Sequence, residues 1–445
     1  MGLDTESVAN FLTSGFKMIS SSPKNSKIAV IGLGYVGLPL AVRLAEHFPV
    51  LGFDVNTQRL DELRNKQDRT GECDADTLES AQYLLSSDIA DIADCNVYIV
   101  TVPTPVKQNN APDLTAVLAA SADIGTVLTT GDVIVYESTV YPGVTEDICG
   151  PALEQASELI CGRDFFLGYS PERINPGDRK HTLDRITKVI AGQTPEVTDL
   201  LGNIYGAITS GGVFRATNIK TAEAAKVIEN AQRDINIAFI NEVAMIFNKM
   251  GIQTHDVLEA AGTKWNFLDF KPGLVGGHCI GVDPFYLAHA ARQAGHDPEV
   301  ILAGRRINDG FAKFVATQIH DVLAKPDAAR ILVLGLTFKE NVPDLRNSKV
   351  ADLVSTLRQN GHTVEVHDAL ADINEARSEY AINLLTDLET CGNFDCVIGA
   401  VPHNQYLDLD ADSLSTLLKP NGLLADLKGM WRGVSLGEDF RRWEL

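Results

Sequence analysis

A glycine cluster near the start of the chain constrains the fold more than any other sequence feature. Residues 32–37 read Gly-Leu-Gly-Tyr-Val-Gly, directly after the β-branched run 27–32 and at the start of a helical pattern over 37–47. Glycines that close a strand and open a helix let a pyrophosphate approach backbone N–H groups at the helix N-terminus. The cluster therefore predicts a dinucleotide-binding turn, with Gly32, Gly34, Tyr35, Val36 and Gly37 as cofactor-binding residues.

Asp54 ends the next predicted strand, 49–54. A carboxylate at this position binds the ribose 2′-hydroxyl and repels a 2′-phosphate, so we predict NAD and not NADP as the cofactor. An ordinary glycine-rich connection is the alternative, and Asp54 argues against it.

The chain alternates short apolar runs with helical patterns at both ends, which predicts parallel, doubly wound α/β sheets. In the first half the predicted strands are 27–32, 49–54, 96–102, 132–138 and 165–170. In the last third they are 330–336, 363–368, 395–401 and 422–429, with a helix over 347–360. Since VPTP near residue 103 is echoed by VPHN near 402, we expect two Rossmann-like domains.

The middle of the chain is helical in pattern. Apolar residues recur at helical spacing from 218 to about 249, without Gly or Pro until residue 251, and helical patterns follow over 251–262 and 284–325. A helix of about 30 residues spans roughly 45 Å, enough to connect two domains. We therefore predict an extension (1–26), an NAD-binding Rossmann domain (27–217), a central helical domain (218–325) and a second Rossmann-like domain (326–445); the family resemblance described below implies that the central domain dimerises and that the last one binds UDP.

Composition narrows the function. The net charge of −21 argues against nucleic-acid partners and anionic membranes. The seven cysteines are scattered without a CxxC pair, which favours reduced thiols in the cytoplasm and gives no metal site. No apolar run is long enough to span a bilayer, and residues 1–26 do not resemble a signal peptide.

Cys279 is the strongest candidate for a catalytic residue, because it lies in the glycine-rich segment Gly276-Gly277-His278-Cys279, and Asp283 follows four residues later. Glycines on the N-terminal side let a thiol meet a ligand, whereas most cysteines are simply small buried hydrophobic residues. A metal site at His278–Cys279 would need further ligands, and none stands at suitable spacing. We therefore interpret Cys279 as a nucleophile and Asp283 as a carboxylate acting at the same centre.

Two further groups are candidates. Lys226 and Asn230 are four residues apart, hence on one face of the predicted helix, although such a pair commonly lies on a solvated surface. Glu172 and Arg173 follow the predicted strand 165–170, and α/β active sites form at strand ends. Glu172 is otherwise an ordinary loop carboxylate.

Taken together, these motifs resemble the UDP-glucose/GDP-mannose dehydrogenase family. The resemblance rests on KIAVIGLGYVGLPLA, YESTVYPG, YSPERINPGD, AEAAKVIENAQRDINIAFINE, GGHCIGVDPFYL and LGLTFKENVPDLRNSK, in this order between residues 27 and about 432. It implies an NAD-dependent four-electron oxidation of a UDP-sugar at C6, by a homodimer or larger homo-oligomer.

The resemblance also assigns roles. It implies Cys279 as the covalent nucleophile, with Lys226, Asn230, Asp283 and Glu172 as catalytic residues. Further cofactor contacts are expected at Arg59, Thr104, Thr139 and Arg346. Substrate contacts are expected at Glu172, Arg173, Lys226, Asn230, Gly276, Phe338, Lys339 and Arg306.

The departures from UDP-glucose enzymes bear on the substrate. His278 stands where those enzymes have Ser, and Val282 where they have Lys. This form resembles the branch, of the Vi-polysaccharide type, that oxidises UDP-N-acetylglucosamine or UDP-N-acetylgalactosamine for capsular and O-antigen polysaccharides. The segment 263–270 lacks the Arg of the UDP-glucose enzymes, and Arg305 and Arg306 are the candidate replacements.

Four alternatives remain. UDP-N-acetylmannosamine or UDP-glucose would be a different substrate of the same reaction. A β-hydroxyacid or 6-phosphogluconate-type dehydrogenase shares the first domain and a helix lysine, but needs neither Cys279 nor a second Rossmann domain. An inactive NAD-binding regulatory protein would not need the set Cys279, Lys226, Asn230, Glu172 and Asp283.

Overall fold

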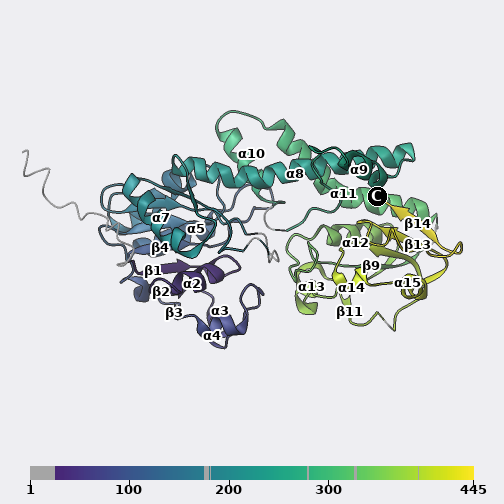
Figure 1. The fold of residues 1–445 in the computed structure, drawn as a ribbon, viewed down its shortest axis with the longest axis horizontal. Coiled ribbons are helices and arrows are strands. Elements are labelled where there is room, and N and C mark those ends of the chain that lie inside the picture. The colour runs from purple at the N-terminus through teal and green to yellow at the C-terminus, as the bar shows by residue number, and fades with distance from the viewer. Residues whose placement is uncertain (1–25, 175–179, 181, 278–279, 325–327, 389) are drawn as a thin grey trace, which may run out of the picture. The chain divides into compact units, whose positions relative to one another are not determined.

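The computed structural model describes residues 26–174, 180, 182–277, 280–324, 328–388 and 390–445. The predictions for residues 1–25 and for His278 and Cys279 therefore lie outside the described residues. The chain divides into two compact units, of which the first ends at Val227 and the second begins at Ile228 (Figure 1). The three-domain division, with its central helical domain, remains a prediction.

The first unit is built on an eight-stranded sheet of order β3-β2-β1-β4-β5-β6-β7-β8. All neighbouring strands are parallel except β6 and β7. The strands are β1 (Ile28–Ile31), β2 (Val50–Phe53), β3 (Tyr83–Ser86), β4 (Val97–Val100), β5 (Val133–Tyr136), β6 (Phe166–Tyr169), β7 (Lys188–Gly192) and β8 (Val213–Arg215).

Apolar side chains on both faces of this sheet are covered by helices, which is why its central strands are continuous hydrophobic runs. Val97 and Ile99 of β4 join a buried cluster with α2 and α7, whereas Tyr98 and Val100 project to the opposite face, as alternate strand residues must. The helices are α2 (Gly37–Ala45), α3 (Thr57–Arg64), α4 (Ala75–Ser80), η2 (Ile89–Ile92), α5 (Thr115–Gly125), η3 (Val144–Cys149), α6 (Gly150–Ser157) and α7 (Pro195–Ile208).

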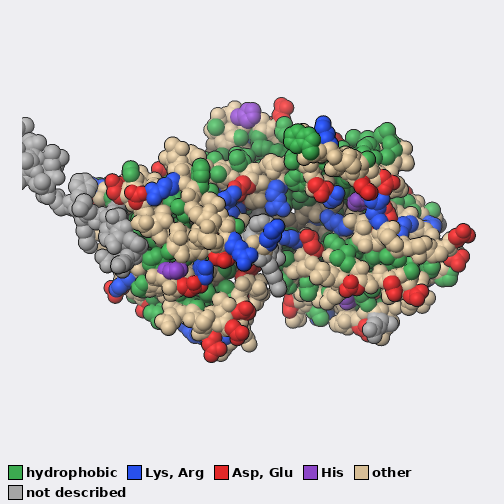
Figure 2. Space-filling model, in the orientation of Figure 1, with side chains coloured by type: hydrophobic (Ala, Val, Ile, Leu, Met, Phe, Trp, Pro, Cys, Tyr) green, Lys and Arg blue, Asp and Glu red, His purple; other side chains and the backbone are tan. Residues whose placement is uncertain are grey.

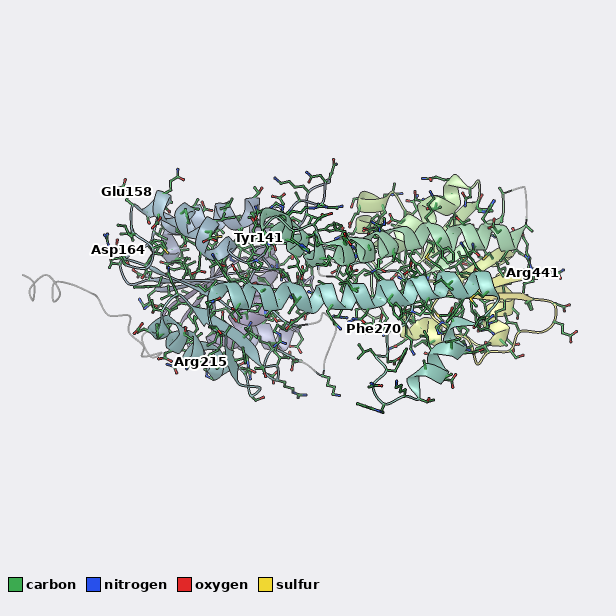
Figure 3. The ribbon with its side chains drawn as sticks, turned by 90° about the horizontal axis from the view of Figure 1, so that it is seen from above. Tyr141, Glu158, Asp164, Arg215, Phe270 and Arg441 are labelled. Atoms are coloured by element: carbon green, nitrogen blue, oxygen red, sulfur yellow. The ribbon has the colours of Figure 1, made fainter. Side chains whose placement is uncertain are left out.

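The predicted long helix is α8 (Ile219–Met250), drawn without a break in Figure 3. It begins in the first unit and continues in the second, where α9 (Thr254–Gly262), α10 (Asp283–Gln293) and α11 (Glu299–Leu323) follow. The helical pattern over 284–325 forms two helices and not one, because Gly295 takes a positive φ of 82° and Pro298 caps α11.

The second unit contains a six-stranded parallel sheet of order β11-β10-β9-β12-β13-β14. Its strands are β9 (Arg330–Leu334), β10 (Thr363–His367), β11 (Leu384–Leu385), β12 (Phe394–Gly399), β13 (Leu418–Asp426) and β14 (Arg441–Glu444). Its remaining helices are α12 (Lys349–Gln359), α13 (Ile373–Tyr380), α14 (Asn404–Leu407) and α15 (Ala411–Leu417).

Both sheets have the strand order 3-2-1-4-5-6 of the dinucleotide-binding fold, with two more strands added to the first. The prediction of two doubly wound Rossmann-like sheets, with a long helix between their sequences, is therefore confirmed. Within the described part of the chain, no helix has the length and apolar character required to cross a membrane.

Candidate active site

The glycine turn after β1 has the geometry that a dinucleotide requires. Gly32 has a φ of 92°, which disfavours any residue with a side chain. A Cβ at Gly37 would stand 1.8 Å from the carbonyl oxygen of Gly32, so α2 packs against the turn only with glycine there. A Cβ at Gly34 would meet nothing within 4 Å. The turn is thus closed on its inner side and open on the side that a pyrophosphate would approach.

Asp54 is fixed beside this turn. Its Oδ2 accepts a hydrogen bond from the backbone N–H of Leu33 (2.8 Å), and its Oδ1 accepts one from Asn56 (2.8 Å). Arg59 is buried beneath the same turn, where its Nε donates to the carbonyl oxygen of Leu33 (2.9 Å) and its Nη2 pairs with Asp68 (2.7 Å). The structure therefore gives Arg59 a supporting contact to the predicted cofactor turn.

The ends of β4 and β5 meet at the same edge of the sheet. There the hydroxyl of Thr104 donates to the carbonyl oxygen of Thr139 (2.7 Å), which brings the two predicted nicotinamide-side residues together. Tyr35 and Val36 are half-buried in the glycine turn. The turn, the N-terminus of α2 and Asp54 fit NAD, since they supply backbone N–H groups to a pyrophosphate and a carboxylate to a ribose.

Glu172 lies in the loop after β6 and is almost fully buried. Its Oε1 accepts hydrogen bonds from the backbone N–H groups of Arg173 (2.5 Å) and Ile174 (2.6 Å). Its Oε2 stands 3.4 Å from Nζ of Lys188, which also pairs with Glu137 at 2.9 Å. The Arg173 side chain is exposed and donates to the carbonyl oxygen of Thr187. Sequence reasoning missed Lys188 and Glu137; a lysine at the start of the apolar run KVIAG was the available signal.

Lys226 and Asn230 lie one turn apart on α8, and both are buried, which makes a solvated helix surface the wrong interpretation. Asn230 donates from Nδ2 to Oδ2 of Asp283 at 2.5 Å. Asp283 is the first residue of α10 and only 2% exposed. The structure thus joins two of the predicted catalytic residues, and the carboxylate fixes which way the amide points.

The glycines before Cys279 pack against the loop that follows β9. A Cβ at Gly276 would stand 2.6 Å from the carbonyl oxygen of Asn347, and one at Gly277 would stand 2.7 Å from the ring of Phe338. The N–H of Gly277 donates to the carbonyl oxygen of Arg346 (3.2 Å). Three predicted binding residues, Gly276, Phe338 and Arg346, therefore belong to one packed region, and Lys339 next to Phe338 is half-buried.

The two candidate arginines differ in their surroundings. Arg305 is 2% exposed, and its guanidinium is paired with Asp234 and Asp309, each at 2.5 Å. Two carboxylates already balance its charge. Arg306 is exposed on α11. Of the two, Arg306 is the better placed for a phosphate or sugar, and its role remains a prediction.

The second sheet repeats the strand–turn geometry, but the carboxylate that follows its second strand is buried, whereas Asp54 is half-buried. Asp368 follows β10 as Asp54 follows β2, but its Oδ2 accepts hydrogen bonds from the N–H groups of both Leu336 (2.5 Å) and Thr337 (2.9 Å). Burial opposes ionisation, yet the hydrogen bond from His403 and these N–H groups hold the pKa of Asp368 well below its usual range. Both carboxylates thus hold their turns, but Asp368 is buried and also bonded to His403, which sets this sheet apart from the NAD-type sheet.

Two Rossmann sheets, of which the first carries an NAD-type turn, define an NAD-dependent dehydrogenase with a second nucleotide-binding domain. The sequence matches the UDP-glucose/GDP-mannose dehydrogenase family through its NAD binding domain (residues 26–209), its central domain (220–310) and its UDP binding domain (332–433). The chain therefore belongs to this family, and the predictions of family, enzyme class and NAD as cofactor are confirmed.

Similar proteins span nearly the whole chain. UDP-N-acetyl-D-glucosamine 6-dehydrogenase of Pseudomonas aeruginosa is 51% identical over 410 residues, covering 91% of this chain and 97% of that protein. The enzyme of the same name from Salmonella typhi is 48% identical over 407 residues, covering 90% and 96%. The structure of UDP-D-ManNAc dehydrogenase from Pyrococcus horikoshii superimposes with a TM-score of 0.84 at 28% identity, covering 94% of this chain and 98% of that one.

Proposed function

We propose that this protein oxidises the C6 hydroxyl of UDP-N-acetylglucosamine to the carboxylate, with UDP-N-acetylgalactosamine as the second substrate. The observation that carries this proposal is the identity of about half of all residues to two UDP-N-acetyl-D-glucosamine 6-dehydrogenases, over nearly the full length. UDP-N-acetylmannosamine dehydrogenases are about one-third identical, which makes that substrate the weaker candidate.

Converting an alcohol to an acid removes four electrons, and NAD accepts a hydride in each of the two oxidations. In the proposed mechanism the Cys279 thiolate adds to the C6 aldehyde and forms a thiohemiacetal. Oxidation of this adduct gives a thioester, and water then releases the uronic acid and the free thiol. The covalent bond keeps the aldehyde on the enzyme between the two oxidations.

The buried polar residues supply the remaining chemistry. Lys226 and Asn230 would donate to the developing alkoxide, and the hydrogen bond from Asn230 to Asp283 holds the amide in one orientation. Asp283 and Glu172 are the carboxylates available for proton transfer and for activating the water. Lys339, Phe338 and Arg306 are proposed to contact the UDP-sugar.

We propose that the protein forms a homodimer through α8. Large apolar side chains at Ile228, Phe239, Ile246 and Met250 lie along one side of this helix and are 49–61% exposed. Figure 2 shows hydrophobic side chains exposed on the second unit around α8 and α9. An apolar stripe at helical spacing suits an equivalent helix of a second copy. Light scattering should give twice the chain mass, and Phe239→Glu should give the monomer.

We place this reaction in the cytoplasm, as part of polysaccharide precursor synthesis. The six cysteines in the described part of the chain are free thiols, which fits a reducing compartment.

A panel of UDP-sugars tests the substrate. NADH formation should be fastest with UDP-N-acetylglucosamine, then UDP-N-acetylgalactosamine, and slower with UDP-N-acetylmannosamine and UDP-glucose. A methyl-sized difference in fit corresponds to roughly 10–200-fold in kcat/KM. Faster oxidation of UDP-glucose than of both favoured sugars would overturn the substrate and leave the family intact.

A further inference from the structure

Lys188 connects two carboxylates inside the first unit. It is the first residue of β7 and is 0% exposed. Its Nζ stands 2.9 Å from Oε2 of Glu137, at the end of β5, and 3.4 Å from Oε2 of Glu172, in the loop after β6. A charged lysine with no access to water has to be explained by its partners, since burying an unpaired ammonium costs several kcal/mol.

Glu137 is the inner partner. It is 2% exposed, its Oε2 faces Lys188, and its Oε1 accepts a hydrogen bond from the hydroxyl of Tyr205 (2.5 Å). The ring of Tyr205 lies 5.0 Å from the ammonium, at cation–π distance. Burial alone would lower the pKa of Lys188, but Glu137 and Glu172 outweigh it and raise the pKa, so the ammonium is charged.

Glu172 is the outer partner and the one proposed to act on the substrate. Backbone N–H groups of Arg173 and Ile174 hold its Oε1, and Lys188 faces its Oε2. Without the ammonium, nothing in the described contacts of Oε2 would fix that oxygen or offset the charge of Glu137. Burial, Asp68 and Glu172 raise the pKa of Glu72, so a further negative charge is disfavoured near Glu172.

We infer that Lys188 is a positioning residue, which holds the Glu172 carboxylate in one orientation for its proton-transfer step. Lys188 acts through Glu172 and contacts no substrate itself. Glu137 supports this role of Lys188, because its carboxylate pairs with the same ammonium. This inference rests on the proposed function of Glu172.

The test compares kcat and KM for UDP-N-acetylglucosamine at pH 7 in the wild type and three variants. Lys188→Gln combined with Glu137→Gln removes both inner charges and leaves Glu172 with the backbone N–H groups of Arg173 and Ile174 as partners. We expect its kcat at pH 7 to fall about 10–100-fold with a smaller change in KM, because an acid–base group contributes about 10²–10⁴-fold.

Lys188→Arg keeps the charge and should restore most of kcat. Glu137→Gln alone keeps the ammonium beside Glu172, and its amide oxygen can still accept from Lys188, so its kcat should stay close to that of the wild type. If the double variant does not fold, these two variants decide the question, because a folded Lys188→Arg or Glu137→Gln protein whose kcat falls as far as expected for the double variant would contradict the inference.

A double variant with a lower melting temperature but an unchanged kcat would show a purely structural role and overturn the inference. Wild-type enzyme that oxidises no UDP-sugar would instead overturn the proposed function. The two failures are therefore distinguishable in one set of assays.

Discussion

Asp54 and Leu33 are joined by a 2.8 Å hydrogen bond from the backbone N–H of Leu33 to the carboxylate of Asp54. The bond links the end of β2 to the glycine turn. Asp54, which is expected to bind the ribose, therefore also fixes the turn that is expected to bind the pyrophosphate. Cofactor choice and turn geometry thus depend on one side chain.

Replacement of Asp54 should therefore change the choice of cofactor. Asp54→Asn keeps a hydrogen-bond acceptor for Leu33 but removes the charge that repels a 2′-phosphate, so we expect the NAD/NADP ratio of kcat/KM to fall by at least about 10-fold. Asp54→Ala should lower the ratio too, and weaken NAD binding further because the turn loses its anchor. Equal use of NAD and NADP by the wild type would show that Asp54 does not set the preference.

Lys226 should act in the transition state more than in binding. Loss of one oxyanion donor typically costs about 10²–10³ in rate, so Lys226→Ala should lower kcat by this factor with a smaller change in KM. Lys220→Ala is the matched control, because Lys220 lies on the same helix but is half-exposed and paired with Asp147. A change confined to KM would reassign Lys226 to ground-state contact with the substrate.

Cys279 should be required for release of the acid. Cys279→Ala is expected to abolish steady-state turnover, and Cys279→Ser to leave at most slow accumulation of an ester or a partly oxidised sugar. Cys73→Ala serves as the control, since burial raises the pKa of the Cys73 thiol to about 12 and makes it a poor nucleophile. Full activity of Cys279→Ala would exclude the covalent mechanism.

Glu223 should make the stability of the first unit depend on pH. Burial raises the pKa of Glu223 to about 7, against hydrogen bonds from the N–H groups of Gly143 (2.6 Å) and Thr145 (2.9 Å). The folded state therefore binds this proton more tightly than the unfolded state, whose carboxyl has the usual pKa of 4.5. This contribution to stability is full below about pH 4.5 and is lost as the pH rises through about 7.

Urea unfolding of the wild type and Glu223→Gln at several pH values measures this effect. The wild type should lose free energy of unfolding relative to the variant between pH 5 and 8. A difference between the two proteins that stays constant with pH would assign the pH dependence to other carboxylates.

The strands that could be predicted from the sequence are those marked by a run of consecutive apolar residues. β1, β2, β4, β5 and β6 are buried runs and were expected from their β-branched residues. β3 and β8 were not expected, because they are short and largely open to solvent, and so lack a clear apolar pattern. β7 was missed because it begins with Lys188, which is typical of a loop unless its partners are known.

The candidate site shows the same division. The glycine turn and Asp54 were predictable, since their spacing in the sequence carries the geometry. The Lys188–Glu137 pair was not, because its members are 51 positions apart and meet only through the strand order of the sheet. The hydrogen bond from Asn230 to Asp283 likewise depends on how α10 packs on α8, which local pattern does not encode.

The number of NADH molecules formed per UDP-sugar tests the central claim most directly. With limiting UDP-N-acetylglucosamine and excess NAD, the account predicts two NADH and one uronic acid for each sugar consumed, with no free aldehyde trapped by a hydrazine reagent. One NADH per sugar, with an aldehyde as the product, would contradict the four-electron oxidation through Cys279.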